Sequence, residues 1–182
     1  MRGYFFTFEG GEGVGKSTQI RLLAEYLKKR HYDVLCTREP GGTEGAEALR
    51  KALLSGQFKK HGTIIEAVAF AAARCDHVDN LIRPSLEAGK IVLCDRFIDS
   101  TRVYQAGPDT QRYIALLERL AVEDVYPDCT FILDLPVKKA LERIEQRNGT
   151  VKKNDRFEDE DLAVYYERRK GFLEIAEREK ER

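Results

Sequence analysis

The feature that most constrains this chain is a glycine-rich motif near its N-terminus, Gly10-Gly11-Glu12-Gly13-Val14-Gly15-Lys16-Ser17. It matches the pattern G-x-x-x-x-G-K-[ST], in which backbone N–H groups cradle phosphate oxygens, the lysine adds positive charge and the Ser hydroxyl binds Mg²⁺. An apolar segment, Tyr4–Phe8, precedes the motif, and Ile20, Leu23 and Leu27 follow it at helical spacing. A strand, a loop and a helix in this order predict a phosphate-binding loop rather than a glycine-rich turn without a ligand.

Short apolar runs alternate with helical patterns along the chain. Because the runs lack the strict alternation of a half-exposed strand, they predict strands buried on both faces, as in a parallel sheet. The runs are Tyr4–Phe8, Asp33–Thr37, Ile91–Cys94 and Thr130–Leu135. The helical patterns are Ala46, Leu49 and Leu53; Ile114, Leu117 and Leu120; Val137, Leu141 and Ile144; and Leu162, Tyr165 and Phe172. We therefore expect one α/β domain over residues 1–182, with a four-stranded parallel sheet covered by helices.

Composition narrows the partners that this chain can have. Its 182 residues suit one globular domain, and 31 Lys and Arg balance 31 Asp and Glu. A nucleic-acid-binding protein usually carries a basic excess, so we expect no nucleic acid partner. The longest uncharged apolar stretch, Ala67–Ala73, is too short to span a bilayer, and the N-terminus has no signal-peptide pattern, so we expect no membrane attachment. Four widely spaced cysteines without a C-x-x-C pair favour buried free thiols in a reducing cytoplasm.

Several classes of phosphate-loop protein do not fit the sequence. The D-x-x-G and N-K-x-D motifs of GTPase switches are absent from it. Leu54-Ser55-Gly56-Gln57 resembles part of a transporter-ATPase signature, but it follows the phosphate loop too closely and is interpreted as a helix end. The chain is also too short for a helicase core. A small kinase that acts on a small acceptor remains.

Two arginines at predicted strand ends are candidates for binding a second phosphate. Arg38 opens the run Arg38-Glu39-Pro40-Gly41-Gly42-Thr43, and Arg96 follows Asp95 at the end of the Ile91–Cys94 run. The carboxyl ends of parallel strands share one edge of a sheet, so both guanidinium groups can form a fork there, with a structural salt bridge as the alternative for each. Asp95, beside the phosphate loop, is placed to hold Mg²⁺ directly or through water.

A candidate base-binding pair lies between those two strands. Phe70 and Arg74 are four residues apart and therefore share one helix face. An aromatic ring and a guanidinium suit stacking on a base and hydrogen bonding to its carbonyl edge, but an apolar helix face is more often part of the core. The segment Ser100-Thr101-Arg102-Val103-Tyr104-Gln105 is equally ambiguous by itself.

Taken together, these blocks resemble the thymidylate kinase family. They occur in the family's order and rough spacing from residue 4 to about 178: Phe8-Glu9-Gly10-Gly11-Glu12-Gly13-Val14-Gly15-Lys16-Ser17-Thr18, Arg38-Glu39-Pro40-Gly41-Gly42-Thr43, Phe70 with Arg74, Asp95-Arg96-Phe97, Ser100-Thr101 with Tyr104-Gln105, and Leu133-Asp134-Leu135-Pro136. The resemblance implies the three-layer fold of P-loop nucleoside-monophosphate kinases, with a lid at about residues 143–158. It also implies a homodimer that uses ATP and Mg²⁺ to convert dTMP to dTDP, with ADP as the second product, in dTTP biosynthesis.

The resemblance further implies a role for each matching residue. Phe70 stacks on thymine, Arg74 bonds the carbonyl edge of the base, and Tyr104 crowds the sugar. Glu12 lies near the sugar 3′-hydroxyl. The implied dTMP contacts are Glu12, Arg38, Phe70, Arg74, Arg96, Ser100, Thr101, Tyr104 and Gln105, with Arg38 and Arg96 on the phosphate; Gly10 to Thr18 contact ATP, Ser17 and Asp95 hold Mg²⁺, and Lys16, Asp95 and Arg96 are catalytic.

A further catalytic arginine is implied to come from the lid, because the phosphate loop has no arginine at positions 11 to 14. Arg147 is the first candidate, since it ends a helical pattern where the turn-rich stretch Asn148–Asp155 begins. Arg143 lies one turn behind it on the same helix face. Arg156 is the third candidate, with a salt bridge to a nearby acid as its alternative.

Two further points follow from the resemblance. Family members continue past the lid helix into a fifth strand and a last helix, whereas this sequence stops in Glu-Arg-Glu-Lys-Glu-Arg. The alternatives to a dTMP kinase are a kinase for another small nucleotide or nucleoside, and a nucleotide-binding switch without turnover.

Overall fold

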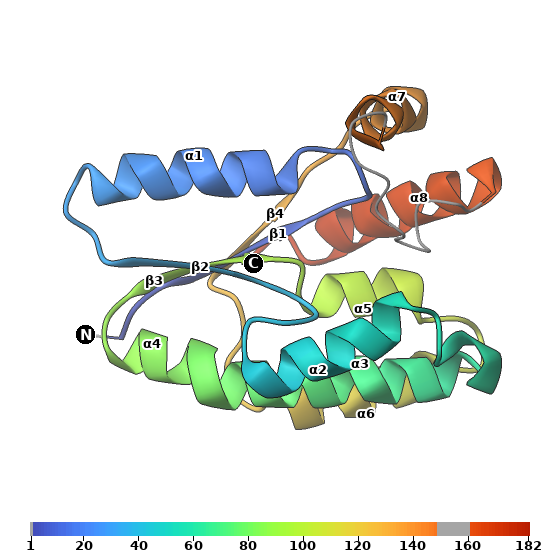
Figure 1. The fold of residues 1–182 in the computed structure, drawn as a ribbon, viewed down its shortest axis with the longest axis horizontal. Coiled ribbons are helices and arrows are strands. Elements are labelled where there is room, and N and C mark those ends of the chain that lie inside the picture. Colours follow the sequence, from blue (N-terminus) through green and yellow to red (C-terminus); the bar gives the residue numbers. More distant parts are fainter. Residues whose placement is uncertain (1, 149–160) are drawn as a thin grey trace.

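A parallel sheet of four strands forms the centre of the computed structural model, which describes residues 2–148 and 161–182 (Figure 1). The strands are β1 (Phe5–Glu9), β2 (Val34–Arg38), β3 (Ile91–Asp95) and β4 (Cys129–Ile132), in the order β2-β3-β1-β4. Each neighbouring pair is parallel. The predicted parallel sheet is therefore confirmed. The first three strands differ from the predicted runs by no more than one residue at either end, and β4 ends at Ile132 rather than at Leu135.

The fourth strand ends early because the chain turns toward a helix. The Leu133 amide still donates to the Glu9 carbonyl oxygen at 2.9 Å. Asp134, the next residue, accepts hydrogen bonds from Nε and Nη2 of Arg169 at 2.6 and 2.8 Å. Arg169 belongs to α8 (Leu162–Arg178), so this bidentate pair fixes the chain beside α8 once it has left the sheet.

Helices cover both faces of the sheet, which confirms the expected three-layer α/β arrangement (Figure 1). One face carries α1 (Lys16–Lys28), the opposite face carries α2 to α6, and α7 and α8 lie near the carboxyl ends of the strands. The remaining bounds are α2 Glu44–Leu54, α3 Thr63–His77, α4 Arg83–Glu87, α5 Ile98–Tyr104, α6 Gln111–Val122 and α7 Val137–Asn148, with a 3₁₀ turn at Lys59–His61 and a π turn at Val78–Ile82. The interpretation of Leu54 as a helix end is also confirmed, since α2 stops there.

Two apolar layers explain why the strand sequences are apolar without alternation. Val92 and Cys94 of β3 are buried with Phe97 in the layer on the α2–α6 side. Ile91 and Leu93 are buried in the layer under α1. Side chains of a strand alternate between the two faces, so a strand covered on both sides must be apolar at every position.

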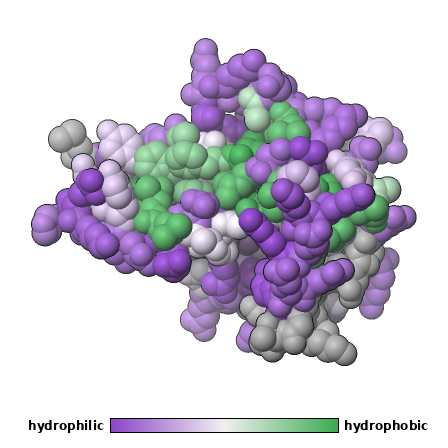
Figure 2. All heavy atoms as spheres, turned by 90° about the horizontal axis from the view of Figure 1, so that it is seen from above, coloured by the Kyte–Doolittle hydropathy of each residue, from purple (hydrophilic) through white to green (hydrophobic). Residues whose placement is uncertain are grey.

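Exposed apolar side chains remain on both sides of the molecule. Seen from the side on which α1 lies, hydrophobic side chains gather across the middle of the surface and hydrophilic ones cover its margins (Figure 2). Phe131 of β4 belongs to this side, because its ring contacts Phe8, which packs under α1, and it is 42% exposed. On the other side Leu120 of α6 is 67% exposed, so it lies outside the core in which its helical pattern had placed it.

The cysteines and the helix lengths test two further predictions. All four cysteines are free, but only Cys94 is fully buried. The prediction of a buried thiol is wrong for Cys36, which is exposed because it lies on the edge strand β2 beside an open hollow. Across the part of the chain that the structure describes, none of the helices combines the length and the apolar composition needed to cross a membrane.

Candidate active site

The predicted phosphate loop is a tight turn between β1 and α1. Gly10, Gly13 and Gly15 have φ angles of 124°, 73° and 103°, a region that side chains strongly disfavour. A Cβ atom on Gly10 would lie 2.4 Å from the Leu133 carbonyl oxygen, and one on Gly13 would lie 2.5 Å from the Ala140 carbonyl oxygen. Glycine is therefore required at both positions, because the loop passes against the backbone that follows β4 and against α7.

Lys16 is folded back onto this loop. Its Nζ donates to the carbonyl oxygens of Gly10 and Gly11 at 3.0 and 2.7 Å, and the residue is only 8% exposed. Burial lowers the pKa of Lys16 to about 8, and the nearby charge of Arg96 contributes in the same direction. Among the described residues, the ammonium group has only neutral carbonyl oxygens as hydrogen-bond acceptors, and a phosphate anion would be a better partner.

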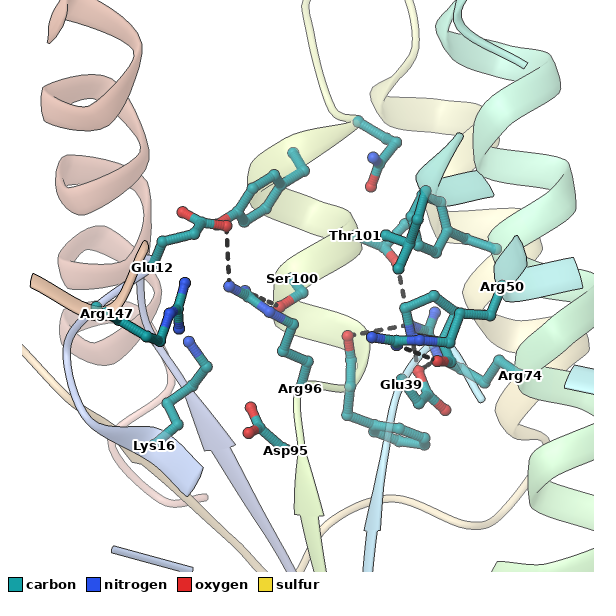
Figure 3. Close-up of a pocket in the computed structure, with 17 residues that line it drawn as sticks. Glu12, Lys16, Glu39, Arg50, Arg74, Asp95, Arg96, Ser100, Thr101 and Arg147 are labelled. Atoms are coloured by element: carbon teal, nitrogen blue, oxygen red, sulfur yellow. Dashed lines mark hydrogen bonds and ion pairs between the residues drawn. The ribbon is translucent and has the colours of Figure 1, made fainter. Parts of the chain in front are cut away.

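A cavity opens beside the loop and holds most of the predicted site residues (Figure 3). Its volume is about 190 Å³. Its walls come from the phosphate loop, the end of β3, α2, α3, α5 and α7. The lining includes Glu12, Gly13, Lys16, Glu39, Arg50, Phe70, Arg74, Asp95, Arg96, Ser100, Thr101, Tyr104, Gln105 and Arg147.

Arg96 organises the end of the cavity next to the phosphate loop. Its Nη1 donates to Ser100 Oγ at 3.0 Å and to the Gly10 carbonyl oxygen at 3.2 Å, and its Nη2 donates to Glu12 Oε1 at 3.0 Å. Its backbone adopts a positive φ of 70°, which turns the side chain from the end of β3 toward the loop. The guanidinium is partly exposed to the cavity, so a cation is fixed beside Lys16 where an anion could reach both.

Glu12 and Tyr104 form a half-buried pair at the same end. The Tyr104 hydroxyl donates to Glu12 Oε1 at 2.6 Å, while Glu12 Oε2 is buried and has no hydrogen-bond partner among the described residues. Burial by itself raises the pKa of Glu12, but the charge of Arg96 and the hydrogen bond from Tyr104 outweigh burial and hold the pKa below its ordinary value. Glu12 is therefore an ionised carboxylate with one oxygen available to a ligand donor.

Arg168 supports this pair from α8. Its guanidinium carbon lies 4.1 Å from the centre of the Tyr104 ring, and that of Arg96 lies 5.1 Å from the same centre. The phenol is thus close to two cations, both of which are also near Glu12. Sequence patterns gave Arg168 no role, because its partner lies on a different helix more than sixty residues away in sequence.

The opposite end of the cavity is formed by α3 and α5. Phe70 is half-buried on the wall, and Arg74, four residues later, is 3% exposed. Arg74 donates from Nε to Glu39 Oε2 at 2.7 Å, and from Nη2 to Phe97 O and Thr101 Oγ1 at 3.0 Å each (Figure 3). Its Nη1 has no hydrogen-bond partner in the described part of the chain, so it is the donor left for a ligand.

Gln105 and Ser100, two other predicted residues, are held by buried acids. Gln105 donates from Nε2 to Glu66 Oε1 at 3.0 Å. Ser100 donates from Oγ to Glu9 Oε2 at 2.7 Å, and Glu9 also accepts the amides of Phe97 and Ser100 at the start of α5. Burial, together with the charge of Asp99, raises the pKa of Glu9 to about 7. The wall of the cavity is therefore fixed by polar contacts behind it.

Ser17 and Asp95 meet at the predicted metal site. The Ser17 hydroxyl donates to Asp95 Oδ2 at 2.7 Å, across the gap between α1 and β3. A hydroxyl and a carboxylate are hard oxygen ligands of the kind that Mg²⁺ takes, usually together with waters and substrate phosphates. The pair fits such an ion, although the described residues contain no cluster of three or more His, Cys, Asp or Glu side chains that could bind a metal by itself.

Arg38 is the one predicted dTMP contact that does not line the cavity. It donates from Nη2 to Glu47 Oε1 at 2.8 Å, and its side chain is 52% exposed. It lines a second hollow with Ser17 and Asp95, so Asp95 borders both spaces. The ion pair with α2 draws Arg38 aside, and the predicted fork with Arg96 is not assembled here.

Arg50 of α2 takes a place on the cavity wall that the sequence did not indicate. It donates from Nη1 to the Pro40 carbonyl oxygen at 2.5 Å. The residue lies among the apolar positions of α2, and nothing in its local sequence distinguishes it from an ordinary surface arginine. Only the packing of α2 beside the Arg38–Thr43 segment brings it to the cavity.

The lid candidates lie in or just beyond α7. Arg147 lines the cavity and points toward Lys16 in Figure 3. Arg143 lies against the phosphate loop, since its Nη1 would be 3.8 Å from a Cβ atom on Gly15. Arg156 and the stretch 149–160 lie outside the described residues.

The parallel sheet, the phosphate loop at the end of β1 and the cavity beyond it define the class of the P-loop nucleotide kinases. Within that class the chain belongs to the thymidylate kinase family, whose model "Thymidylate kinase" matches residues 8–182. It is 52% identical over 184 residues to a thymidylate kinase of Bartonella quintana (strain Toulouse), covering 100% of this chain and 86% of the relative. A thymidylate kinase of Bartonella henselae is 53% identical over 185 residues, with the same coverage.

A solved structure supports the same assignment. The crystal structure of thymidylate kinase from Ehrlichia chaffeensis matches with a TM-score of 0.79 and 39% sequence identity. The match covers 100% of this chain and 91% of that chain. At this identity the likeness extends beyond the fold to the family.

Proposed function

We propose that this chain transfers the γ-phosphoryl group of ATP to dTMP, forming dTDP and ADP, as one catalytic domain over residues 1–182. The observation that carries the proposal is the cavity with two chemically different ends. Lys16 and Arg96 provide cations at the phosphate-loop end, and Phe70 and Arg74 provide a ring and a guanidinium at the other. Family membership supports the same reaction, which supplies dTDP for dTTP synthesis.

The proposed substrate pose follows from the two ends. Thymine stacks on Phe70 and accepts a hydrogen bond from Nη1 of Arg74 at its carbonyl edge, with Thr101 and Gln105 beside it. The sugar lies at Tyr104, where the free Oε2 of Glu12 accepts the 3′-hydroxyl. The monophosphate lies at Arg96 and Ser100, with Arg50 on the nearby wall and Arg38 recruited from its exposed ion pair.

ATP is proposed to bind through the backbone of residues 10–18. Ser17 and Asp95 would hold Mg²⁺, which would neutralise part of the charge of the phosphates. Lys16 would exchange its carbonyl partners for the β- and γ-phosphates, since a charged acceptor makes a stronger hydrogen bond than a neutral one.

The chemistry requires no general base. A phosphate monoester has a second pKa near 6, so the attacking group of dTMP is already mostly dianionic at pH 7. The difficulty is to bring two polyanions together and to stabilise a loose transition state, which positioning and cationic charge accomplish. Lys16 and Arg96 are proposed to supply that charge from the phosphate-loop end of the cavity. Arg147, with Arg143 one turn earlier on α7, is proposed to supply it from the lid.

An acceptor screen tests the proposal directly. The chain is incubated with ATP and Mg²⁺ and with dTMP, dUMP, dCMP, dGMP or thymidine, and ADP and the phosphorylated product are both measured. We expect dTMP to be the best acceptor and dUMP to be weaker by about ten- to a hundredfold, because one methyl group is worth only about 1–3 kcal/mol. A faster reaction with another nucleotide or with thymidine would favour the alternative kinase, and nucleotide binding without product would favour a switch.

A homodimer is proposed for the helical side of the molecule that lies away from α1. The helices α3 and α6 pack against each other, and each exposes apolar residues one turn apart. The exposed set is Ile64, Ile65 and Val68 of α3 with Leu116 and Leu120 of α6. Exposed apolar side chains on two helices that pack together suit an isologous interface with a second copy of the chain.

Sedimentation velocity tests the dimer. We expect a dimer in the parent and a monomer in Leu120→Glu, with Leu22→Glu on α1 as the matched control that stays dimeric. A monomeric parent at micromolar concentration would contradict the proposal. A cytoplasmic location stays a prediction, supported by the four free thiols.

A further inference from the structure

A series of hydrogen-bonded side chains lies behind Arg74, on the side away from the cavity. His77, three residues further along α3, is 0% exposed. Its Nδ1 lies 3.1 Å from Glu39 Oε1, and its Nε2 lies 2.7 Å from Thr37 Oγ1. Glu39 Oε2 in turn accepts Arg74 Nε at 2.7 Å. Thr37, His77, Glu39 and Arg74 therefore form one continuous connection from β2 to the cavity wall.

The protonation of this connection follows from its chemistry. Burial alone raises the pKa of Glu39, but the charge of Arg74 and the hydrogen bond from His77 outweigh burial and hold the pKa below its ordinary value. An ionised carboxylate can only accept, so Nδ1 of His77 must carry a proton. Nε2 lies within hydrogen-bond distance of the Thr37 hydroxyl, so the imidazole has a partner at both nitrogens.

The turn after β2 keeps His77 in place. Gly42 has a φ of 98°, and a Cβ atom there would lie 2.6 Å from both His77 Nε2 and Thr37 Oγ1. The backbone therefore passes directly over the bond between these two side chains. Asp76, the neighbour of His77, accepts hydrogen bonds from the Ala46 amide at 3.0 Å and from the Thr43 hydroxyl.

We propose that His77 is a positioning residue for base recognition, which acts through Glu39 on the orientation of Arg74. His77 occupies Oε1 of Glu39, so only Oε2 is directed at Arg74, where it faces Nε and Nη2. Nη2 can then also donate to Phe97 O and Thr101 Oγ1, and Nη1 remains directed at the cavity. The inference rests on the proposed function, because it takes Arg74 to be the residue that reads the base.

Loss of His77 has a specific consequence in this arrangement. A buried carboxylate oxygen without a donor is costly, so Glu39 would turn to offer both oxygens to the Arg74 fork. Nη2 would then leave Phe97 O and Thr101, and the plane of the guanidinium would rotate away from the base. The expected defect is in nucleotide selection, and the site of phosphoryl transfer should be unaffected.

Two amide substitutions separate the two nitrogens of the imidazole. In His77→Asn the short side chain places an N–H near the former Nδ1, within reach of Glu39. In His77→Gln the longer side chain places its amide near the former Nε2, beside Thr37, and leaves Glu39 Oε1 without a donor. Calorimetric titration with dTMP should give a Kd within about threefold of the parent for Asn and about tenfold weaker for Gln, as expected for one lost charge-assisted hydrogen bond.

Further readouts distinguish positioning from simple destabilisation. The Kd for ATP should stay within about twofold in both variants, and binding of dCMP should change less than binding of dTMP. Thr37→Val is the matched control: it removes the other partner of the same imidazole, so it should lower the melting temperature with a dTMP Kd within about threefold of the parent. In an Arg74→Met background, His77→Gln should have no further effect on the dTMP Kd.

The outcomes separate this inference from the proposed function. Equal dTMP affinity of the Asn and Gln variants, or parallel losses for dTMP and dCMP, would overturn the role of His77. Additive effects of His77→Gln and Arg74→Met would overturn it as well. A parent that binds dTMP but forms no dTDP with ATP overturns the proposed function alone, since the binding comparison still decides the role of His77. A parent that binds no dTMP overturns both.

Discussion

The two ends of the cavity hold their buried cations in opposite ways. At the phosphate-loop end, Lys16 donates to two neutral carbonyl oxygens of its own loop, and burial lowers its pKa to about 8. At the base end, Arg74 is paired with the buried carboxylate of Glu39, and three of its hydrogen bonds are already made. Lys16 must therefore change partners when a phosphate arrives, whereas Arg74 is already oriented.

This difference indicates where ligand binding and selectivity originate. A cation on neutral partners gains much from an incoming anion, so the phosphate-loop end can supply binding energy and transition-state charge. A cation fixed by a carboxylate offers one remaining donor in a defined direction, so the base end can supply discrimination. The four predictions that follow test this division, from the largest expected effect to the smallest.

Lys16→Ala removes the charge proposed to move onto the β- and γ-phosphates. We expect turnover to fall by roughly 10³-fold, since loss of one preorganised electrostatic donor typically costs about 10²–10³. Steady-state assays with saturating ATP and dTMP measure this, and circular dichroism should remain native because the hydrogen bonds of Lys16 are made to its own loop. Turnover within about threefold of the parent would remove Lys16 from the mechanism.

Arg147→Ala removes the first lid candidate from the phosphate-loop end. We expect a loss of turnover of about 10²-fold or more, as for arginine fingers in comparable phosphoryl transfers, with the dTMP Kd and melting temperature little changed. Lys139→Ala on the exposed side of the same helix is the control and should behave like the parent. If Arg147, Arg143 and Arg156 can each be replaced without loss, Arg38 and Arg96 with Mg²⁺ would have to supply the charge.

Replacing dTMP by dCMP tests the base end. Cytosine places an amino group where Nη1 of Arg74 needs an acceptor, so two donors face each other and kcat/KM should fall by about thirtyfold or more. Arg74→Met should reduce the difference between the two nucleotides by lowering the rate with dTMP. Equal rates with dTMP and dCMP in the parent would show that Arg74 does not read the base.

The pH dependence of ATP use gives the smallest effect. Because the pKa of Lys16 is lowered to about 8, the free enzyme loses this charge as the pH rises through that value. We expect kcat/KM for ATP to decline above pH 8 by at most about tenfold per pH unit, with kcat at saturating ATP less affected, because bound phosphate raises the Lys16 pKa again. A flat profile between pH 7 and 9.5 would contradict a titrating lysine at this position.

The sequence predicts the phosphate-loop end much better than the base end. The four strands and the phosphate loop follow from short-range patterns. Burial on both faces requires an uninterrupted apolar run, and a tight turn requires several glycines close together in the sequence. The contacts of Glu39 with Arg74 and His77 join residues 35 and 38 positions apart, so they depend on how α3 packs beside the turn after β2. No local pattern encodes that packing.

Arg38 and Leu120 are residues for which a local pattern led to a wrong prediction. Both were assigned from sound local reasons, a position at a strand end and a helical repeat. Arg38 instead pairs with Glu47 of α2, and Leu120 is exposed because α6 packs through another side. In each case a neighbouring helix decides the outcome, and the sequence around the residue carries no information about that helix.

The contact between Gly13 and α7 gives the phosphate loop a mechanical role. A Cβ atom on Gly13 would collide with the Ala140 carbonyl oxygen, so the backbone of the loop is in close contact with α7 at this point. At about 1.5 Å per residue, Arg143 and Arg147 lie about 4.5 and 10.5 Å along α7 from this contact, so a small tilt about the contact displaces Arg147 more than twice as far as Arg143. A larger residue at position 13 would displace α7 and misdirect both arginines, in addition to straining the loop itself.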